Sequence, residues 1–213
     1  MDLTPGGSAL LIIDMQNGFL HPQGSCASIG LPCDALRAAV PGCRQLLEAA
    51  RRERMPVIFT RYMYRPDYSD GGVVIREFFP DLATSGALRA GSWDAEVVDE
   101  LAPREGELVV DKNRPSAFYG TPLESYLNGL HADSLIVCGV TTNVCVETTV
   151  RDAMQRDLKV WVVGEATAEF DRDRHEAALH SMGWMFGQVV RLDAVLKEIP
   201  RLAGEREPAA AGS

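Results

Sequence analysis

Short runs of apolar residues alternate with amphipathic stretches along the whole chain. There are six such runs: Ser8–Ile13, Val57–Thr60, Leu108–Asp111, Ser134–Val140, Lys159–Val163 and Gln188–Arg191. Each run is apolar enough to be buried on both sides, which is typical of strands in a parallel sheet that helices cover on both faces. The alternation therefore predicts an α/β fold, a three-layer α/β/α sandwich around a six-stranded, mostly parallel sheet of the Rossmann-like kind.

Helical periodicity fills much of the chain between these runs. The predicted helices span residues 34–53, 122–129, 143–156 and 171–185. Asp34 is a suitable N-cap for the first of them, which repeats apolar residues at spacings of three and four. The second begins with Thr121 as its cap and Pro122 in the first helical position. These helices supply the outer layers of the predicted sandwich.

One long segment and the C-terminus depart from this regular order. Residues 61–93 are rich in Gly, Pro, Tyr and Asp and are longer than a typical connection between elements. We expect this segment to form a lid or a subunit contact. Residues 1–202 are expected to fold as a single domain, and residues 203–213 to form a disordered tail.

Composition and charge exclude several classes of partner. The chain has 213 residues, of which 21 are Lys or Arg and 30 are Asp or Glu, giving a formal net charge of −9. A surface with this charge repels nucleic acid and anionic lipid, so neither is an expected partner. The opening residues show no basic stretch ahead of an apolar one, and no apolar run is long enough to span a membrane. We therefore expect a cytoplasmic protein.

The number and spacing of the cysteines indicate reduced thiols and no disulfide framework. There are five of them, Cys26, Cys33, Cys43, Cys138 and Cys145, and no two form a C-x-x-C pair. An odd number without that spacing fits neither a disulfide framework nor a zinc site. Cys138 lies inside an apolar run and is expected to be a small core residue. One of the other thiols is a candidate nucleophile.

Three reactive side chains follow three of the predicted strands. Asp14 directly follows the first run, Lys112 directly follows the third, and Cys145 lies five residues beyond the fourth. Ligands bind at the carboxyl ends of the strands in an open parallel sheet. If these strands are neighbours, a carboxylate, an ammonium and a thiol therefore meet at one edge of the sheet.

Each of these residues also has an ordinary structural interpretation. An Asp after a strand often caps a turn, a Lys is usually a solvated charge, and a Cys between a strand and a helix can be a buried, inert thiol. The histidines offer no better base, because His175 and His180 lack the spacing of a helical metal pair and His175 is interpreted as an exposed helix residue. Asp14 is then the candidate base for the Cys145 thiol.

Three blocks of sequence carry a resemblance to a known family. They are residues 11–19 (LIIDMQNGF), residues 112–118 (KNRPSAF) and residues 139–149 (GVTTNVCVETT). Each block brings one of the three reactive residues, and together they resemble the signature blocks of the isochorismatase-like cysteine hydrolases. The resemblance runs from Ala9 to Leu192 with the blocks in the same order.

The resemblance implies a fold and a catalytic arrangement. The fold is a six-stranded parallel sheet between helices, and Asp14, Lys112 and Cys145 form the catalytic triad. A cis peptide bond is implied between Val140 and Thr141, an isomer that costs about 3 kcal/mol for a non-proline pair. It would aim the amide N–H groups of Thr141 and Cys145 at one oxyanion. The family also implies a homo-oligomer, a dimer or a tetramer.

The triad implies a covalent mechanism. Asp14 removes the thiol proton, Cys145 attacks the carbonyl of a small amide, ureido or carbamoyl compound, and Asp14 returns the proton to the departing ammonia. Water then releases the acid from a thioester-type intermediate, while Lys112 stabilises charge and orients Asp14. The presence of Cys145 favours C–N hydrolysis over the vinyl ether cleavage of true isochorismatases. Stretches such as residues 91–94 look most like ureidoacrylate and N-carbamoylsarcosine amidohydrolases.

No metal or other cofactor is expected from the resemblance. Nicotinamidases of the family bind a metal through an Asp-x-His pair after the second strand, whereas residues 61–64 are RYMY in this chain. Two alternatives stay open, another small-molecule hydrolase of the family and a thiol redox or binding protein on the same fold. In the redox case Cys26 or Cys33 would have to be the resolving thiol.

A further set of residues is predicted to line the substrate pocket. It consists of five aromatic residues, one cation and two amides: Phe19, Tyr62, Tyr64, Trp93, Phe118, Arg61, Asn17 and Asn143. The cation is a candidate clamp for a substrate carboxylate, and the amides could donate to a carbonyl. The aromatic residues could equally be packing or subunit contacts, and the amides could satisfy turn backbone.

Overall fold

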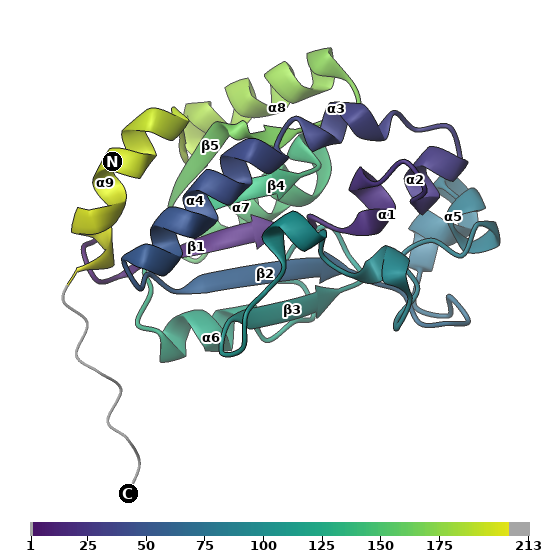
Figure 1. Cartoon of the computed structure of the whole chain (residues 1–213), viewed down its shortest axis with the longest axis horizontal. Helices are drawn as coiled ribbons and strands as arrows, with labels where there is room; N and C mark the ends of the chain where they lie inside the picture. The colour runs from purple at the N-terminus through teal and green to yellow at the C-terminus, as the bar shows by residue number, and fades with distance from the viewer. Residues whose placement is uncertain (1, 205–213) are drawn as a thin grey trace, which may run out of the picture.

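Six parallel strands form the central layer of the protein, whose computed structural model describes residues 2–204 (Figure 1). The strands are β1 (Ser8–Ile13), β2 (Val57–Tyr62), β3 (Leu108–Lys112), β4 (Ser134–Val140), β5 (Lys159–Ala168) and β6 (Gln188–Val190). Their order across the sheet is β3-β2-β1-β4-β5-β6, and every neighbouring pair is parallel. The predicted α/β fold with a six-stranded sheet is confirmed.

Helices cover both faces of this sheet. The α-helices are α1 (Asn17–Leu20), α2 (Ser25–Ser28), α3 (Cys33–Arg37), α4 (Val40–Arg52), α5 (Asp81–Thr84), α6 (Leu123–Gly129), α7 (Glu147–Met154), α8 (Arg172–Met185) and α9 (Leu192–Ala203). Two π-helices, η1 (Val74–Phe78) and η4 (Thr142–Val146), and two 3-10 turns, η2 (Trp93–Ala95) and η3 (Asp99–Leu101), complete the described elements. Helices α4 and α9 pack on one face of the sheet, and α6, α7 and α8 pack on the other.

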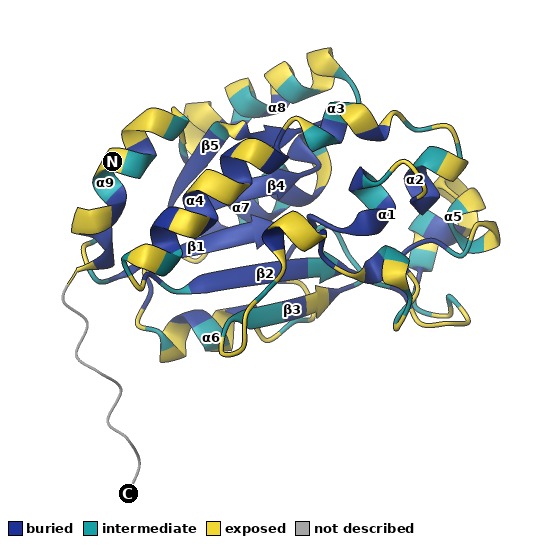
Figure 2. Ribbon diagram, in the orientation of Figure 1, coloured by how far each residue is buried: buried dark blue, intermediate teal, exposed yellow. Residues whose placement is uncertain are grey.

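The central strands are buried on both sides, as Figure 2 shows by their dark blue colour. Leu10 and Ile12 of β1 pack with α4 and α9, whereas Leu11 and Ile13 pack with α6, α7 and α8. Both faces of β1 therefore need apolar side chains, which is why its sequence is a continuous apolar run without alternation.

The prediction of a single helix over residues 34–53 is wrong. The chain forms α3 and then α4, with a break at residues 38–39. Pro41 lies in the first turn of α4, where backbone N–H groups have no partner within the helix, so its missing N–H costs nothing. In the middle of one longer helix the same residue would remove a backbone hydrogen bond, so α3 ends before it. Asp34 consequently lies in the first turn of α3, behind Pro32 at the N-cap position.

The later helices agree with the sequence only in part. The helix predicted over 143–156 starts as the π-helix η4 and becomes α-helical only in α7. Helix α8 begins as predicted, because the Asp171 side chain accepts a hydrogen bond from the N–H of Arg174 at 2.9 Å. Helix α9 was missed, and its last residue is Ala203, the first residue of the predicted tail. Residues 205–213 lie outside the described part of the chain.

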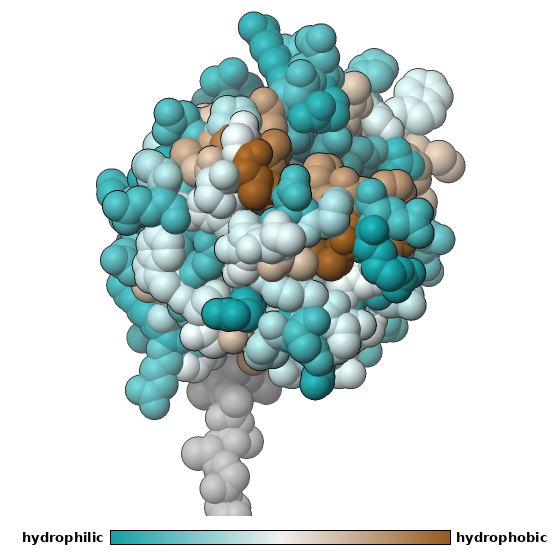
Figure 3. Space-filling model, turned by 90° about the vertical axis from the view of Figure 1, so that its right-hand side faces the viewer, coloured by the Kyte–Doolittle hydropathy of each residue, from teal (hydrophilic) through white to brown (hydrophobic). Residues whose placement is uncertain are grey.

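All strands end at the same side of the molecule. The segment 61–93 crosses this end with η1 and α5, and Val73, Phe78 and Phe79 are exposed there. Figure 3 views this side and shows hydrophobic side chains reaching the surface among hydrophilic ones. That the segment forms a lid or a subunit contact stays a prediction. Among residues 2–204, no helix combines the length and the apolar character needed to cross a bilayer.

Candidate active site

The carboxyl ends of three strands bring together the reactive residues predicted from the sequence. Asp14 directly follows β1, Lys112 is the last residue of β3, and Cys145 lies in η4, which follows β4. Nζ of Lys112 lies 2.7 Å from Oδ2 of Asp14, and both side chains are fully buried. The Cys145 thiol is close enough to both groups for each of them to shift its pKa. A carboxylate, an ammonium and a thiol therefore meet away from bulk water.

Asp14 has a left-handed backbone conformation that aims its carboxylate. Its φ is 52°, in a region that Asp tolerates better than most residues other than glycine. Oδ1 accepts a hydrogen bond from Oγ1 of Thr60 at 2.5 Å. Oδ2 contacts Lys112 and receives no well-aligned hydrogen bond from the described residues. One carboxylate oxygen is thus fixed, and the other is able to take a proton.

Thr60 was missed by the sequence analysis, although a signal for it was present. It closes the predicted run Val57–Thr60, and the rule that strand ends carry functional residues applies to it as it does to Asp14. Its hydroxyl also accepts a hydrogen bond from the N–H of Asp14 at 3.2 Å. Thr60 therefore holds both the backbone and the carboxylate of the candidate base.

Lys112 is a buried cation without access to bulk water. Burial lowers the pKa of Lys112, but the negative charges of Asp14 and Cys145 outweigh this effect and raise the pKa above its usual value. Nζ also donates to the carbonyl oxygen of Arg114 at 3.2 Å and lies 4.3 Å from the centre of the Tyr62 ring. Lys112 consequently stays protonated and supplies a fixed positive charge.

The Cys145 thiol is protonated at rest. Burial raises the pKa of Cys145 to about 12, Lys112 acts in the opposite direction, and Asp14 raises the pKa further. Burial is the largest of these effects and outweighs the opposing charge of Lys112. The thiol needs a base to become a nucleophile, and Asp14 is the carboxylate beside it.

The end of β4 fits closely against β1. The Val140–Thr141 peptide bond is cis, which is the isomer that the family resemblance implies. Gly139 has a φ of 116°, and a Cβ on it would lie 2.1 Å from the carbonyl oxygen of Ile13. Only glycine allows this approach of the two strands. Thr141, the predicted oxyanion donor, follows directly and is itself buried.

Three of the predicted pocket aromatics are buried close to the triad. Tyr62 and Tyr64 have ring centres 5.2 Å apart, and burial raises the pKa of Tyr64 to about 12. Burial is the main cause that raises the pKa of both tyrosines, and the Tyr62 ring centre lies 4.3 Å from Nζ of Lys112. Phe118 belongs to the same apolar cluster as Cys145, and the Arg156 guanidinium lies 4.6 Å from its ring centre.

Trp93 and Phe19 are less enclosed. The Trp93 side chain is half exposed, and its ring meets the edge of the His21 ring at a centre-to-centre distance of 4.9 Å. Phe19 is partly buried and packs against both apolar clusters of the protein. Packing therefore accounts for the observed contacts of both residues.

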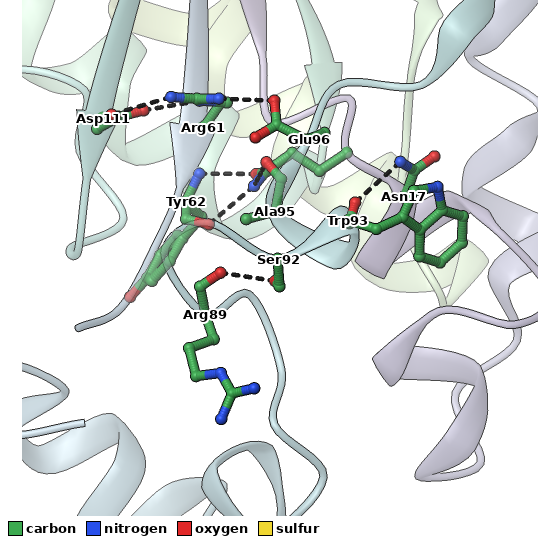
Figure 4. Close-up of polar contacts among 10 residues, drawn as sticks. Asn17, Arg61, Tyr62, Arg89, Ser92, Trp93, Ala95, Glu96 and Asp111 are labelled. Carbon is green, nitrogen blue, oxygen red and sulfur yellow. Dashed lines mark hydrogen bonds and ion pairs between the residues drawn. The ribbon is translucent and has the colours of Figure 1, made fainter. Parts of the chain in front are cut away.

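Arg61 is not available as a substrate clamp in the way that the sequence suggested. Figure 4 shows its guanidinium between Asp111 and Glu96, on the side of β2 away from the Tyr62 ring. It donates to Asp111 at 2.8 and 3.1 Å and to Glu96 at 2.8 Å. Side chains alternate along a strand, so neighbouring Tyr62 faces the triad while Arg61 faces away from it.

Gln16 anchors this region and was not predicted. Its side-chain oxygen accepts the N–H of Tyr62 at 2.7 Å, and its amide nitrogen donates to the carbonyl oxygens of Tyr62 and Ala95, each at 2.9 Å. Nearby, the amide of Asn17 donates to the carbonyl oxygen of Trp93 at 2.9 Å (Figure 4). Asn17 therefore satisfies loop backbone, which was the second of the two roles left open for it.

Asn143 behaves differently from Asn17. It lies in η4, two residues before Cys145, and its Oδ1 atom is buried without a hydrogen-bond partner among residues 2–204. A buried amide oxygen of this kind is costly unless something donates to it. Asn143 does not satisfy turn backbone through this atom, so Oδ1 stays available to a ligand.

A cavity of ≈ 440 Å³ opens beside the triad at the ends of β2 and β3. Its lining residues are Met63, Tyr64, Arg65, Pro66, Asp70, Ala90, Asp111, Lys112, Asn113 and Gly120. Asp70 holds the rim together, because its carboxylate accepts the N–H of Arg65 and the side-chain amide of Asn113, both at 3.0 Å. A second cavity of ≈ 370 Å³ lies at the opposite ends of these strands and contains none of the predicted site residues.

The thiols and acidic groups show no metal centre in the described part of the chain. All five cysteines are free and buried. No group of three or more His, Cys, Asp and Glu side chains among residues 2–204 is arranged to hold a metal ion.

Comparisons with known proteins identify the family of the chain. A model of the isochorismatase domain matches residues 8–194. The ureidoacrylate amidohydrolase RutB of Methylobacterium radiotolerans is 31% identical over 202 residues, covering 88% of this chain and 77% of that protein.

Two crystal structures extend the likeness to the fold. A cysteine hydrolase from Pseudomonas syringae has a TM-score of 0.83 and 31% identity, and the match covers 93% of this chain and 97% of that one. An N-carbamoylsarcosine amidase from Thermoplasma acidophilum has a TM-score of 0.71 and 28% identity over 87% of this chain and 96% of that one. The chain belongs to the isochorismatase domain family.

Proposed function

We propose that the protein is a cysteine-dependent amidohydrolase that cleaves the C–N bond of a small amide, ureido or carbamoyl compound and releases ammonia. The observation that carries this proposal is the buried contact between Asp14 and Lys112 beside the Cys145 thiol. A protonated thiol, a carboxylate that can take its proton and a fixed cation are the groups that nucleophilic hydrolysis requires. The names of the relatives, an amidohydrolase, a cysteine hydrolase and an amidase, support the same reaction class.

Formation of the covalent intermediate uses all three residues. Oδ2 of Asp14 takes the thiol proton, and Sγ of Cys145 attacks the substrate carbonyl carbon. The oxyanion that forms accepts hydrogen bonds from the N–H groups of Thr141 and Cys145. Asp14 then gives its proton to the departing nitrogen as the C–N bond breaks, and ammonia leaves. A thioester remains for an amide substrate, and a thiocarbamate remains for a ureido substrate.

Hydrolysis of this intermediate returns the enzyme to its starting state. Asp14 removes a proton from water, and the hydroxide attacks the thioester carbonyl. The C–S bond breaks, and the thiolate of Cys145 takes the proton back from Asp14. Lys112 keeps its proton throughout, because neighbouring negative charge raises its pKa. Its role is to offset the charge that moves between the carboxylate and the sulfur.

Two features of the site support a ureido or carbamoyl substrate. The rings of Tyr62, Tyr64 and Phe118 supply flat, apolar surface within the same hydrophobic cluster as Cys145. Oδ1 of Asn143 is an unpartnered acceptor two residues from the nucleophile, and the terminal NH₂ of a ureido group is a matching donor. Among the relatives, one is named for ureidoacrylate and another for N-carbamoylsarcosine, both of which carry such a group.

Ammonia release by the wild type and by Cys145→Ala tests the proposal. The panel is ureidoacrylate, N-carbamoylsarcosine, biuret, nicotinamide and maleamate, with each substrate given to both proteins at equal concentration. We expect release from at least one ureido compound by the wild type and none above background by the variant. Turnover that survives in Cys145→Ala would overturn the covalent mechanism, and a wild type that releases ammonia from no panel member would overturn the substrate class.

A further inference from the structure

A second polar cluster lies behind the nucleophile, on the side that faces α8. Thr142 is the first residue of η4 and is fully buried. Its Oγ1 atom lies 2.8 Å from Nδ1 of His175, in the first turns of α8. The two residues are 33 positions apart in the sequence, so this contact ties two separate elements together. His175 is therefore not the plain surface residue that the sequence suggested.

A buried carboxylate completes the cluster. Val140 pairs with Ala168 across β4 and β5, so Glu169 leaves the sheet beside Thr141. The Glu169 side chain is 3% exposed, and its Oε1 atom accepts the N–H of Phe170 at 3.0 Å. Its Oε2 atom is buried without a partner among the described residues. The guanidinium of Arg174, the residue before His175, contacts the same Oε1 atom, so the carboxylate lies against the first turn of α8.

The charge state of His175 follows from its surroundings. Burial lowers the pKa of His175, and the charges of Glu169 and Glu176 oppose this effect without cancelling it. Arg174, on the same helix, contacts Glu169 at 3.5 Å and takes up part of its charge. The imidazole is therefore neutral at neutral pH, and its Nδ1 atom makes one hydrogen bond with the Thr142 hydroxyl.

We propose that His175 is a positioning residue for the nucleophile and the oxyanion donor. Thr142 stands between Thr141, whose amide is proposed to hold the oxyanion, and Cys145, which is proposed to attack. A hydrogen bond from α8 to the Thr142 side chain fixes the turn that carries both groups. This inference rests on the proposed function of Cys145 as nucleophile.

The rest of the interface between η4, α7 and α8 supports a rigid arrangement. Arg151 of α7 donates to Ser181 of α8 at 2.7 Å, and its guanidinium lies 4.0 Å from the Phe186 ring centre. The bond between Thr142 and His175 adds a side-chain hydrogen bond from α8 to the nucleophile's own turn. Displacement of reacting groups by about 1 Å is enough to cost orders of magnitude in rate.

The test compares variants that remove this bond with variants that keep it. His175→Leu and Thr142→Val each remove one partner at similar volume, and the double variant removes both. His175→Asn retains a polar group near the Nδ1 position. His180→Leu is the matched control, because His180 is exposed on the same helix. For each protein we would measure kcat, KM and the fraction folded, using the panel substrate that the wild type hydrolyses.

We expect kcat to fall about five- to tenfold in His175→Leu, the effect of one net hydrogen bond, with KM within about twofold. Thr142→Val should lose a similar factor, and the double variant should lose no more than either single variant. His175→Asn should recover most of the rate, and His180→Leu should match the wild type.

Several results would overturn the positioning role. They are an unchanged kcat in His175→Leu, losses that multiply in the double variant, or a loss that merely tracks the unfolded fraction. Thr142→Val keeps the test valid if His175→Leu fails to fold, since Val conserves the shape of Thr. Failure of the proposed function gives a separate signal, because Cys145→Ala would then retain activity whatever the His175 variants do.

Discussion

Two ion pairs at the ends of β2 and β3 are made of the same kinds of groups but differ in burial, in their number of hydrogen bonds and in the side of the sheet they occupy. In the sheet register Arg61 pairs with Asp111, and the next residues, Tyr62 and Lys112, pair with each other. Side chains alternate, so Arg61 and Asp111 point to one side of the sheet and Lys112 points to the other, where it meets Asp14. Neighbouring positions thus build two different pairs.

The Arg61 pair is saturated and partly exposed. Three hydrogen bonds join its guanidinium to Asp111 and Glu96, whose side chains are 43% and 53% exposed. The Lys112 pair is fully buried, and a single ion-pair contact of 2.7 Å joins Nζ to Oδ2 of Asp14. A charge becomes reactive where burial keeps water away and one oxygen stays open, and the presence of a pair alone does not create that condition.

Of the variants considered, Lys112→Met, which removes the cation of the buried pair, should have the largest effect on stability and activity. It leaves the Asp14 carboxylate buried without its cation, which should lower the free energy of unfolding by about 3–5 kcal/mol and abolish activity. Urea unfolding and ammonia release measure the two losses. A variant as stable as the wild type would contradict the account of Asp14 as a buried anion.

Asp14→Asn distinguishes two effects of Asp14, its role as proton acceptor and the effect of its charge on the pKa of Cys145. We expect kcat to fall about 10²- to 10⁴-fold, because no group can then accept the thiol proton. Alkylation of Cys145 by iodoacetamide should become faster, because the Asp14 charge that raises the pKa of Cys145 is gone while Lys112 remains. Peptide mass mapping gives the alkylation rate. Parallel loss of turnover and of alkylation would instead show that loss of the base outweighs the electrostatic effect of the Asp14 charge on the pKa of Cys145.

Asn143→Ala tests the open acceptor near the nucleophile. Removing Oδ1 should lower kcat/KM for a ureido substrate about tenfold, the usual scale for losing a buried hydrogen-bond partner. Asn17→Ala is the comparison variant, since the Asn17 amide already bonds the carbonyl oxygen of Trp93. It should lose stability more than substrate recognition. Equal kcat/KM values for Asn143→Ala and the wild type would remove Asn143 from the proposed site.

High pH should destabilise the buried site. Burial raises the pKa of Cys145 from 9.0 to about 12, so the folded state holds a proton that the unfolded state has already released. The contribution of the neutral Cys145 thiol to the free energy of unfolding is therefore fully present below pH 9.0 and is lost as pH rises toward about 12. Raised pKa values of Lys112 and Tyr64 act in the same direction. Cys145→Ala should flatten this decline in unfolding experiments across that range, and an identical pH profile would argue against a buried neutral thiol.

Arg61→Met should have the smallest effect. An exposed ion pair contributes about 1 kcal/mol or less, and Arg61 faces away from the triad. We expect kcat and KM within about twofold of the wild type. A large rise in KM for carboxylate-bearing substrates, absent for neutral ones, would restore Arg61 as a clamp.

The strands and the meeting of Asp14, Lys112 and Cys145 at one edge of the sheet were predictable because each depends on local sequence. Continuous apolar runs identify strands buried on both faces, and the residue after such a run lies at the edge where ligands bind. The roles of Arg61 and His175 were not predictable, because they depend on which side chains from distant segments face them. Glu96 and Asp111 occupy Arg61, and Thr142 engages His175.

Burial was the other quantity that sequence could not supply. The resting state of Cys145 depends on the balance between Lys112 and complete exclusion of water, and only the folded structure gives that balance. The break between α3 and α4 was missed although Pro41 signalled it, because the apolar spacing on both sides of the proline stays in phase. Local rules gave the elements, whereas tertiary contacts decided their ends and their chemistry.

The most direct test of the central claim, that Cys145 is the nucleophile, is a titration of the wild type with iodoacetamide. Aliquots are assayed for ammonia release and mapped by peptide mass for each of the five cysteines. The account predicts that activity falls in step with alkylation of Cys145, that substrate slows both, and that the other four buried thiols react later. Undiminished activity in a protein whose Cys145 is fully alkylated would contradict it.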